Sequence, residues 1–213
     1  LSLAIENVGT LQGSNTRYSQ MATSNTLNYN KMFGNHSLSV IAGQEALAYD
    51  ESSYYFYAPS VNPDIPFGST AISDEDEIDY GESAFTLLSY FGLLSYSYDS
   101  RYYFQASVRS DGSSRFGADT RWGTFWSVGG SWNLHNEDFL DNLPMINQLK
   151  LRGSYGLSGN YNIGNYEQFG TYGSIQYNGA AGMAPENPAN PDLGWETNRE
   201  YNGGIDFTVF QRF

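Results

Sequence analysis

Long stretches of alternating apolar and polar residues constrain this chain more than any other feature. The clearest stretch runs from residue 88 to residue 109, with a break at 99–101. One set of alternate positions is mostly apolar or aromatic: Leu88, Tyr90, Leu94, Tyr96 and Tyr98 before the break, and Tyr102, Phe104, Ala106 and Val108 after it. Because successive side chains of a strand point to opposite faces, each half is predicted to be a strand with one apolar and one polar face. The three residues of the break predict a tight turn.

Other segments repeat this pattern, and together they predict about eight antiparallel strands. They lie at 126–134, 149–158 and 201–209, with weaker ones near 17–32 and 36–49. The composition agrees, since the chain has 23 glycines, 16% aromatic residues and only 15% charged residues. Few charges together with many Tyr and Gly do not suit a soluble α/β enzyme. They suit β-structure that presents an apolar band outward.

Such alternation has two explanations. In a soluble sandwich the apolar face is the core, whereas in a membrane barrel it meets lipid and the polar face lines a lumen. Three features favour the barrel. The predicted strands, at about 12–15 residues, are long for a soluble sheet, and aromatic residues gather near strand ends, as a membrane interface requires. Charged residues also stand in mid-strand on the polar faces, at Arg109, Lys150, Arg152 and Asp206.

The connections between the predicted strands add an asymmetry. They alternate between short ones, near 34–36 and 99–101, and long ones, near 50–83, 110–121 and 159–194. Outer-membrane barrels have short periplasmic turns and longer outer loops. The connector at 135–148 falls on the short side, and we expect it to hold a helical turn with Asn136 as its cap and Pro144 as its terminator.

Charge and motif content exclude several classes of protein. The net charge of −13, from 10 basic and 23 acidic residues, disfavours nucleic-acid binding, which needs a basic face. There is no cysteine and no transmembrane helix of 18 or more apolar residues. Catalytic triads, phosphate loops and dinucleotide fingerprints are absent, so no enzyme and no cofactor is expected. The first residues resemble the tail of a strand rather than a signal peptide, so we expect an internal fragment.

Four consecutive blocks of residues carry a family resemblance. They read "YFGLLSYSYDSRYYFQASVRSDGSSRFG", "WGTFWSVGGSWNLHNEDFL", "LKLRGSYGLSGN" and "NPDLGWETNREYNGGIDF", and they follow in order between residues 84 and 210. In this order they resemble SusC/RagA-type TonB-dependent outer-membrane transporters. Residues 1–83 are compatible with that family but carry no motif of their own.

The resemblance implies a fold and a function. Residues 1–213 would be a partial TonB-dependent receptor barrel, an all-β, antiparallel transmembrane fragment with roughly eight strands of a 22-stranded barrel. The plug domain and the TonB-binding segment are expected to be absent. Such proteins import glycan oligomers or peptides across the outer membrane of Gram-negative bacteria of the Bacteroidota type. They work beneath a SusD-like surface lipoprotein and are energised through TonB, with outer-membrane lipid around the barrel.

The segment "SVRSDGSSRFG" is the main candidate site, as the start of an outer loop above the lumen. Its glycines permit backbone turns that other residues resist, and its arginines can bind carboxylates through two parallel hydrogen bonds. Two roles are open for these arginines. Either they contact the plug or cargo, or they pair with nearby acids such as Asp111 and Asp119 and so fix the shape of the loop. We favour the second role, which is structural. The candidate loop and lumen residues are Arg109, Asp111, Gly112, Ser113, Ser114, Arg115, Phe116 and Gly117.

Three other segments of the predicted outer loops are notable. Tyr54, Tyr55 and Tyr57 form an aromatic cluster that could stack on sugar rings, although packing within the loop explains it equally well. The acidic run 73–79 lacks the spacing of a calcium loop and is expected to be solvated. The prolines of 184–196 predict a stiff loop before the last strand.

Two alternatives to the importer stay open at this point. The terminal Phe213 and the count of about eight strands are compatible with a small self-contained outer-membrane barrel that acts as an anchor or adhesin. The Tyr-rich loops are compatible with a soluble carbohydrate-binding sandwich. In a sandwich, Tyr102, Phe104, Val128 and Ile205 would meet inside a dry two-layer core.

Overall fold

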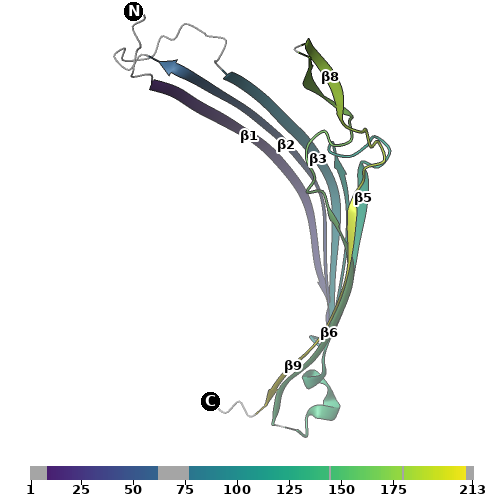
Figure 1. The fold of residues 1–213 in the computed structure, drawn as a ribbon. Helices are drawn as coiled ribbons and strands as arrows, with labels where there is room; N and C mark the ends of the chain where they lie inside the picture. The colour runs from purple at the N-terminus through teal and green to yellow at the C-terminus, as the bar shows by residue number, and fades with distance from the viewer. Residues whose placement is uncertain (1–8, 62–76, 144, 179, 210–213) are drawn as a thin grey trace, which may run out of the picture. The chain divides into compact units, whose positions relative to one another are not determined.

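The computed structural model describes residues 9–61, 77–143, 145–178 and 180–209, and the chain divides into two compact units. One unit takes in residues 1–21 and 48–85, and the other takes in residues 22–47 and 86–213. Almost all of the described residues with regular structure lie in strands (Figure 1). None of the helical turns in these ranges has the length and apolarity that a membrane span requires.

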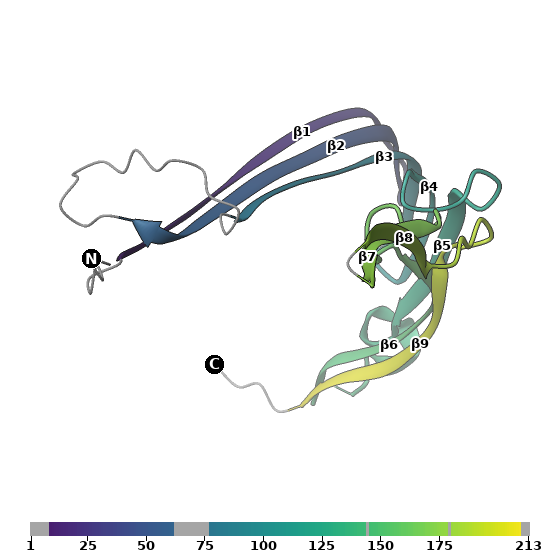
Figure 2. The same ribbon diagram turned by 45° about the horizontal axis from the view of Figure 1, so that its top comes forward.

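Seven strands form one sheet, in the order β1-β2-β3-β4-β5-β6-β9. Neighbouring strands from β3 to β9 are antiparallel, as the alternation predicts. A separate hairpin pairs β7 only with β8 (Figures 1 and 2). The strands are β1 Gly9–Phe33, β2 His36–Val61, β3 Glu77–Tyr98, β4 Tyr102–Ser113, β5 Trp122–Asn133, β6 Ile146–Asn160, β7 Thr171–Tyr177, β8 Ala180–Asn187 and β9 Glu196–Val209.

The strands are longer than the alternation predicts, so three predicted loop boundaries are wrong. β2 continues to Val61 and β3 begins at Glu77, which turns most of the expected loop 50–83 into strand. β4 likewise reaches Ser113, and the expected loop 159–194 contains the β7–β8 hairpin. The reason is that a strand pairs through its backbone, so it persists where the side-chain alternation fades, and aromatic residues favour it.

The strand register aligns side chains of one kind into rows across the sheet. Tyr102 pairs with Trp132, Trp132 with Leu151 and Leu151 with Ile205, which makes an apolar row over four strands. On the other face, the row runs from Gln105 through Gly129 and Ser154 to Asn202. The predicted separation into an apolar and a polar face is therefore confirmed.

No second layer covers the apolar face of the described sheet. Phe104 is 43% exposed, Val128 39% and Ile205 69%. Among the described residues, the buried apolar side chains are Ala58, Phe116 and Phe125, too few for the core of a sandwich. The expected dry contact among Tyr102, Phe104, Val128 and Ile205 is absent, which contradicts the soluble-sandwich alternative.

Two turns at the short-connection end of the sheet follow the predicted positions. β1 and β2 join through Gly34, whose φ is +58°, and Asn35. β3 and β4 join at 99–101, where Asp99 and Ser100 both have positive φ, as the favoured two-residue hairpin turn requires. The amide of Arg101 donates to the carbonyl of Tyr98 at 2.9 Å and closes this turn.

The connector after β5 holds two short 3₁₀ turns, Leu134–Asn136 and Asp138–Leu140. A helical turn here is confirmed, but the predicted cap is wrong. Asn136 ends the first turn, and Glu137 precedes the second without a capping hydrogen bond from its side chain. Its carboxylate is engaged elsewhere, as described below. The proposed terminator, Pro144, lies outside the described residues.

Candidate functional site

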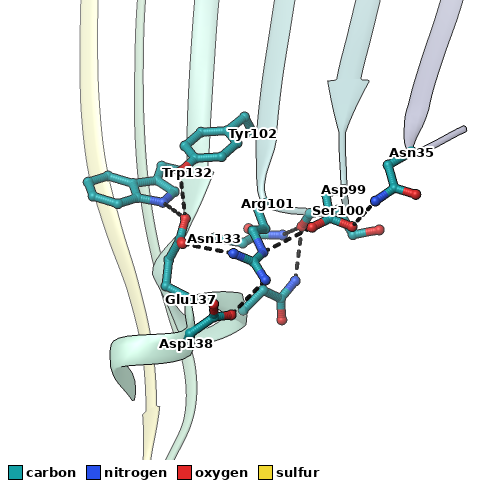
Figure 3. A network of polar contacts seen from close by, with 10 residues as sticks. Asn35, Asp99, Ser100, Arg101, Tyr102, Trp132, Asn133, Glu137 and Asp138 are labelled. Atoms are coloured by element: carbon teal, nitrogen blue, oxygen red, sulfur yellow. Dashed lines mark hydrogen bonds and ion pairs between the residues drawn. The ribbon is translucent and has the colours of Figure 1, made fainter. Parts of the chain in front are cut away.

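A polar network joins the connections at the short-turn end of the sheet (Figure 3). Arg101 is at its centre, and its guanidinium contacts Glu137 at 3.1 Å, Asp138 at 2.8 Å and Asp99 at 3.2 Å. Because the three acids come from the β3–β4 turn and from the connector after β5, one side chain holds two connections together. The sequence analysis missed this network, although Arg101 in the turn and "NED" in the connector were its visible components.

Glu137 is the buried member of the network. It accepts hydrogen bonds from the indole Nε1 of Trp132 and the hydroxyl of Tyr102, each at 2.7 Å. These two bonds, together with the charge of Arg101, outweigh desolvation and hold the pKa of Glu137 below its usual value. The carboxylate therefore stays ionised and anchors the aromatic residues at the ends of β4 and β5.

Amide side chains complete the network around the same turn. Asn133 and Asn136 each donate to the carbonyl of Ser100 at 2.9 Å, and Asn35 donates to Asp99 at 3.0 Å. The β1–β2 turn, the β3–β4 turn and the β5–β6 connector are thus linked into one rim. This arrangement is a structural clamp and offers no group for chemistry on a ligand.

The role of Glu137 gives a pH-dependent expectation for stability. A folded-state pKa below the unfolded value means stabilisation that is present at neutral pH and is lost as the pH falls through the folded pKa. In the full-length protein, Glu137→Gln is therefore expected to lower resistance to urea at pH 7, and the difference from wild type should shrink below about pH 4. Asp138→Asn is the control, because Asp138 is 85% exposed and its pair with Arg101 contributes little. A deficit of Glu137→Gln that is unchanged at low pH would contradict this explanation.

Aromatic side chains form a first belt on the apolar face, next to this rim. His36 stacks on Phe33 at 5.0 Å and contacts Tyr98 at 4.7 Å, while Tyr102 stacks between Tyr98 at 6.3 Å and Trp132 at 6.1 Å. The belt spans β1 to β5. Aromatic residues with polar tips are the residues that membrane–water interfaces favour.

A second belt crosses the same face nearer the long loops. Tyr90 stacks on Trp122 at 6.2 Å, and Trp126, Tyr155 and Tyr201 follow in contact, at 5.4 and 4.6 Å. The ring of Trp122 lies across Gly112, where a Cβ atom would come within 2.8 Å of it. This is why the motif residue Gly112 is a glycine although it lies within a strand.

Arg109 and Asp111 lie on the polar face of β4 rather than in a loop. Arg109 donates through Nε to Asp111 at 2.7 Å and through Nη2 to Glu45 of β2 at 2.9 Å, and its guanidinium lies 5.7 Å from the ring of Phe91. Phe91 in turn fills the space above Gly43. Arg109 thus reaches across β3 and connects three strands on the polar face.

The second half of the motif forms the packed base of the β4–β5 loop. The amide of Ser114 donates to the carbonyl of Thr86 at 3.0 Å, and the hydroxyl of Ser113, which is completely buried, accepts from the amide of Arg115. Arg115 also donates to Asn165 at 2.6 Å and to the carbonyl of Tyr161 at 3.2 Å. These contacts hold the β4–β5 loop against the segment after β6.

Phe116 and Gly117 attach the same loop to the segment before β9. Phe116 is completely buried and packs on Trp195 at 4.9 Å. Gly117 approaches Pro191 so closely that a Cβ atom would lie 1.7 Å from its carbonyl oxygen, and its amide donates to Leu193 at 3.2 Å. The motif therefore builds the loop structure, while a contact of its arginines with the plug or with cargo stays a prediction.

The tyrosines proposed as cargo contacts do not lie in a loop. Tyr54, Tyr55 and Tyr57 belong to β2, in the unit that takes in residues 48–85. Tyr54 is exposed, whereas Tyr55 and Tyr57 are half-buried. Since strand side chains alternate, Tyr54 faces away from the other two, so the three cannot stack on one ligand together. Of the acidic run, residues 73–76 lie outside the described residues, and Glu77 and Asp79 belong to β3.

A hollow on the polar face lies over β4, β5, β6 and β9 and has a volume of about 320 Å³. Its floor consists of glycine and serine residues, and two cationic side chains stand at one end. The lining residues are Tyr103, Gln105, Gly129, Gly130, Ser131, Lys150, Arg152, Gly153, Ser154 and Asn202. In the described part of the chain, no group of acids and histidines has the arrangement of a metal site.

Comparison with known proteins gives consistent matches. The family model for the β-barrel of TonB-dependent receptor-like proteins matches residues 3–213. The structure of the RagAB peptide transporter has a TM-score of 0.86 and 27% identity, and the RagAB peptide importer in its open-open state has a TM-score of 0.81 and 28% identity. Each match covers 95% of this chain and 23% of the other, so the chain spans about a quarter of those transporters. No protein of curated function matches the sequence significantly.

Proposed function

This chain belongs to the TonB-dependent receptor-like family of outer-membrane β-barrels, and on that premise we propose that it forms part of the wall and outer loops of an active importer. Members of this family are transporters rather than enzymes. The single observation that supports a membrane wall is the pair of aromatic belts on the exposed apolar face.

The spacing of the belts fits a lipid bilayer. On β5, Trp126 of the second belt lies six residues from Trp132 of the first belt, and Trp122, the outermost ring of the second belt, lies ten residues from Trp132. At about 3.3 Å per residue that is about 33 Å along the strand, or about 25 Å across the membrane for a strand tilted by about 40°. Bands of about this height are typical of outer-membrane barrels. The rim around Arg101 then faces the periplasm, and the loop around Phe116 faces outward.

The proposed cargo is a peptide or a glycan oligomer. Similarity to the RagAB peptide transporter supports a peptide, and the SusC/RagA-type motifs in the sequence are compatible with either class. We infer that a SusD-like surface lipoprotein covers the outer side of the barrel. Energy would come through TonB acting on parts of the protein outside this segment.

Uptake by intact cells tests the proposal. Cells that produce the full-length protein should accumulate labelled peptides or glycan oligomers, and deletion of TonB should abolish this uptake while the protein stays in the outer membrane. Uptake that persists without TonB would contradict active import. Attachment to surfaces without any uptake would favour the anchor or adhesin alternative.

A further inference from the structure

The connection between β5 and β6 is much longer than the other two connections described at the short-turn end of the sheet. β1 and β2 join through Gly34 and Asn35, and β3 and β4 join through 99–101, whereas residues 134–145 separate β5 from β6. A tight turn of a few residues is enough to join neighbouring antiparallel strands. The additional residues of this connector are therefore available for a contact outside the sheet.

Side-chain contacts hold the connector on the apolar side of the sheet. The carboxylate of Glu137 accepts hydrogen bonds from the hydroxyl of Tyr102 and the indole of Trp132 (Figure 3). These two rings stack on each other in the first aromatic belt, on the exposed apolar face. A further contact fastens the connector to β6, where Nδ1 of His135 lies 3.1 Å from the carbonyl oxygen of Leu149. The connector thus bends toward the outer surface of the wall and away from the polar face.

Apolar side chains of the connector are exposed in this position. Phe139 is 61% exposed, Met145 50% and Leu143 44%. Beside them, Val209 of the apolar face of β9 is also exposed, and it pairs in register with Ile146, the residue that follows Met145. Exposed apolar patches mark surfaces that contact a protein or a membrane. The exposed apolar surface of the wall therefore continues into the connector.

Acidic residues limit how deep the connector can lie in a membrane. Residues 134–145 contain Glu137, Asp138 and Asp141 but no lysine or arginine. Glu137 is paired with Arg101, whereas Asp138 is 85% exposed and Asp141 is exposed as well. Moving a carboxylate into hydrocarbon costs it its hydration, so these groups stay where water reaches them. Apolar side chains next to charges that stay in water are typical of a segment that lies in the plane of the interface.

We propose that the β5–β6 connector is a membrane-contact element in the headgroup layer of the periplasmic leaflet, with Phe139, Leu143 and Met145 inserted between phospholipids. A lipid surface is the partner, because the connector is held by Tyr102 and Trp132 and continues the lipid-facing side of the wall. The sheet extends past the connector on both sides, so further barrel strands join beyond β1 and β9. This inference rests on the proposed membrane wall and adds a connection to the parts that contact lipid.

Photo-crosslinking at single positions tests the contact. The photoreactive amino acid p-benzoylphenylalanine replaces Phe139 or Leu143 in the full-length protein in outer membranes, and mass spectrometry after illumination distinguishes lipid adducts from protein adducts. Phospholipid adducts are expected at both positions, with yields similar to that at Val128 on the exposed apolar face. Ser127 is the matched negative control, because it precedes Val128 on the same strand, faces the other side and should give no lipid adduct.

Variants of Glu137 test how the connector is held. Glu137→Gln removes the charge that pairs with Arg101 and weakens the hydrogen bonds to the belt, so the connector is released toward the periplasm. Lipid adducts at position 139 should then be largely lost, while those at Val128 stay unchanged. Asp138→Asn is the control, since it removes the same charge from an exposed side chain and should not lower the yield. Unchanged adducts in Glu137→Gln would contradict this mode of attachment.

The remaining outcomes separate this inference from the proposed wall. If Val128 gives lipid adducts but positions 139 and 143 give none, the connector lies in water, and this inference is wrong while the membrane wall stands. Protein adducts at positions 139 and 143 would mean that another part of the transporter or a second protein covers the connector, which also contradicts the inference. If Val128 gives no lipid adduct either, the wall assignment itself is contradicted.

Discussion

Arginine in place of Val128 is expected to destabilise the barrel by about 2–4 kcal/mol, the cost of a cation near the bilayer midplane. Val128 lies on β5 between the two aromatic belts, on the exposed apolar face. In this position the guanidinium has no water and no partner, so its desolvation is not compensated. Equilibrium unfolding in urea, with the full-length protein in lipid vesicles and tryptophan fluorescence as the readout, measures the difference.

Gln105→Arg is the control for this substitution. Gln105 lies on β4 and belongs to the polar face, where its register partner is Gly129. A cation there meets the lumen, so the stability should change by less than about 1 kcal/mol. Equal destabilisation by both substitutions would show that the assignment of the two faces is wrong.

Truncation of Phe116 to alanine should give the second large effect, about 3–5 kcal/mol for the cooperative unit formed by the outer loops. Its ring is completely buried against Trp195, which in turn contacts Phe125 and Tyr161. A cavity at this point loosens three segments that are distant in the sequence. The loss should appear as faster hydrogen exchange in residues 114–121 and 188–195, because loops open locally before the sheet unfolds.

Phe139→Ala is the matched control for the loop cluster, since Phe139 is 61% exposed and its removal leaves no cavity. Uptake assays distinguish a structural role of the loop motif from a role in cargo specificity. If the loop has only a structural role, Phe116→Ala should reduce the uptake of different cargoes by similar factors. Unchanged hydrogen exchange in Phe116→Ala would contradict the packing role.

The polar face combines residues that stabilise it with residues that are left available. Arg109 is engaged by Asp111 and Glu45, and the rim acids are engaged by Arg101. Lys150 and Arg152, in contrast, stand beside a floor of small residues with weak internal partners.

Local patterns in the sequence determined the strands, their faces and their tight turns. The period of two at 88–109 sets which side chains share a face, since a strand has no other way to arrange them. Asp99 and Ser100 tolerate the backbone conformation that the hairpin turn needs. The ordered motifs between residues 84 and 210 indicated the family, which the comparison with known proteins then showed.

Only the tertiary structure decided where the strands end and which distant residues meet. Backbone pairing extends β2 through Tyr54–Tyr57, where the side-chain pattern suggested a loop. Strand register and loop packing bring Arg101 to Glu137 and Phe116 to Trp195, over separations that no local spacing encodes. The same register places Lys150 and Arg152 beside one hollow and Glu200 beside a second hollow that shares Ser154 and Asn202 with the first. Alternation is a property of one strand, whereas register is a property of the sheet. A site that spans several strands depends on the register.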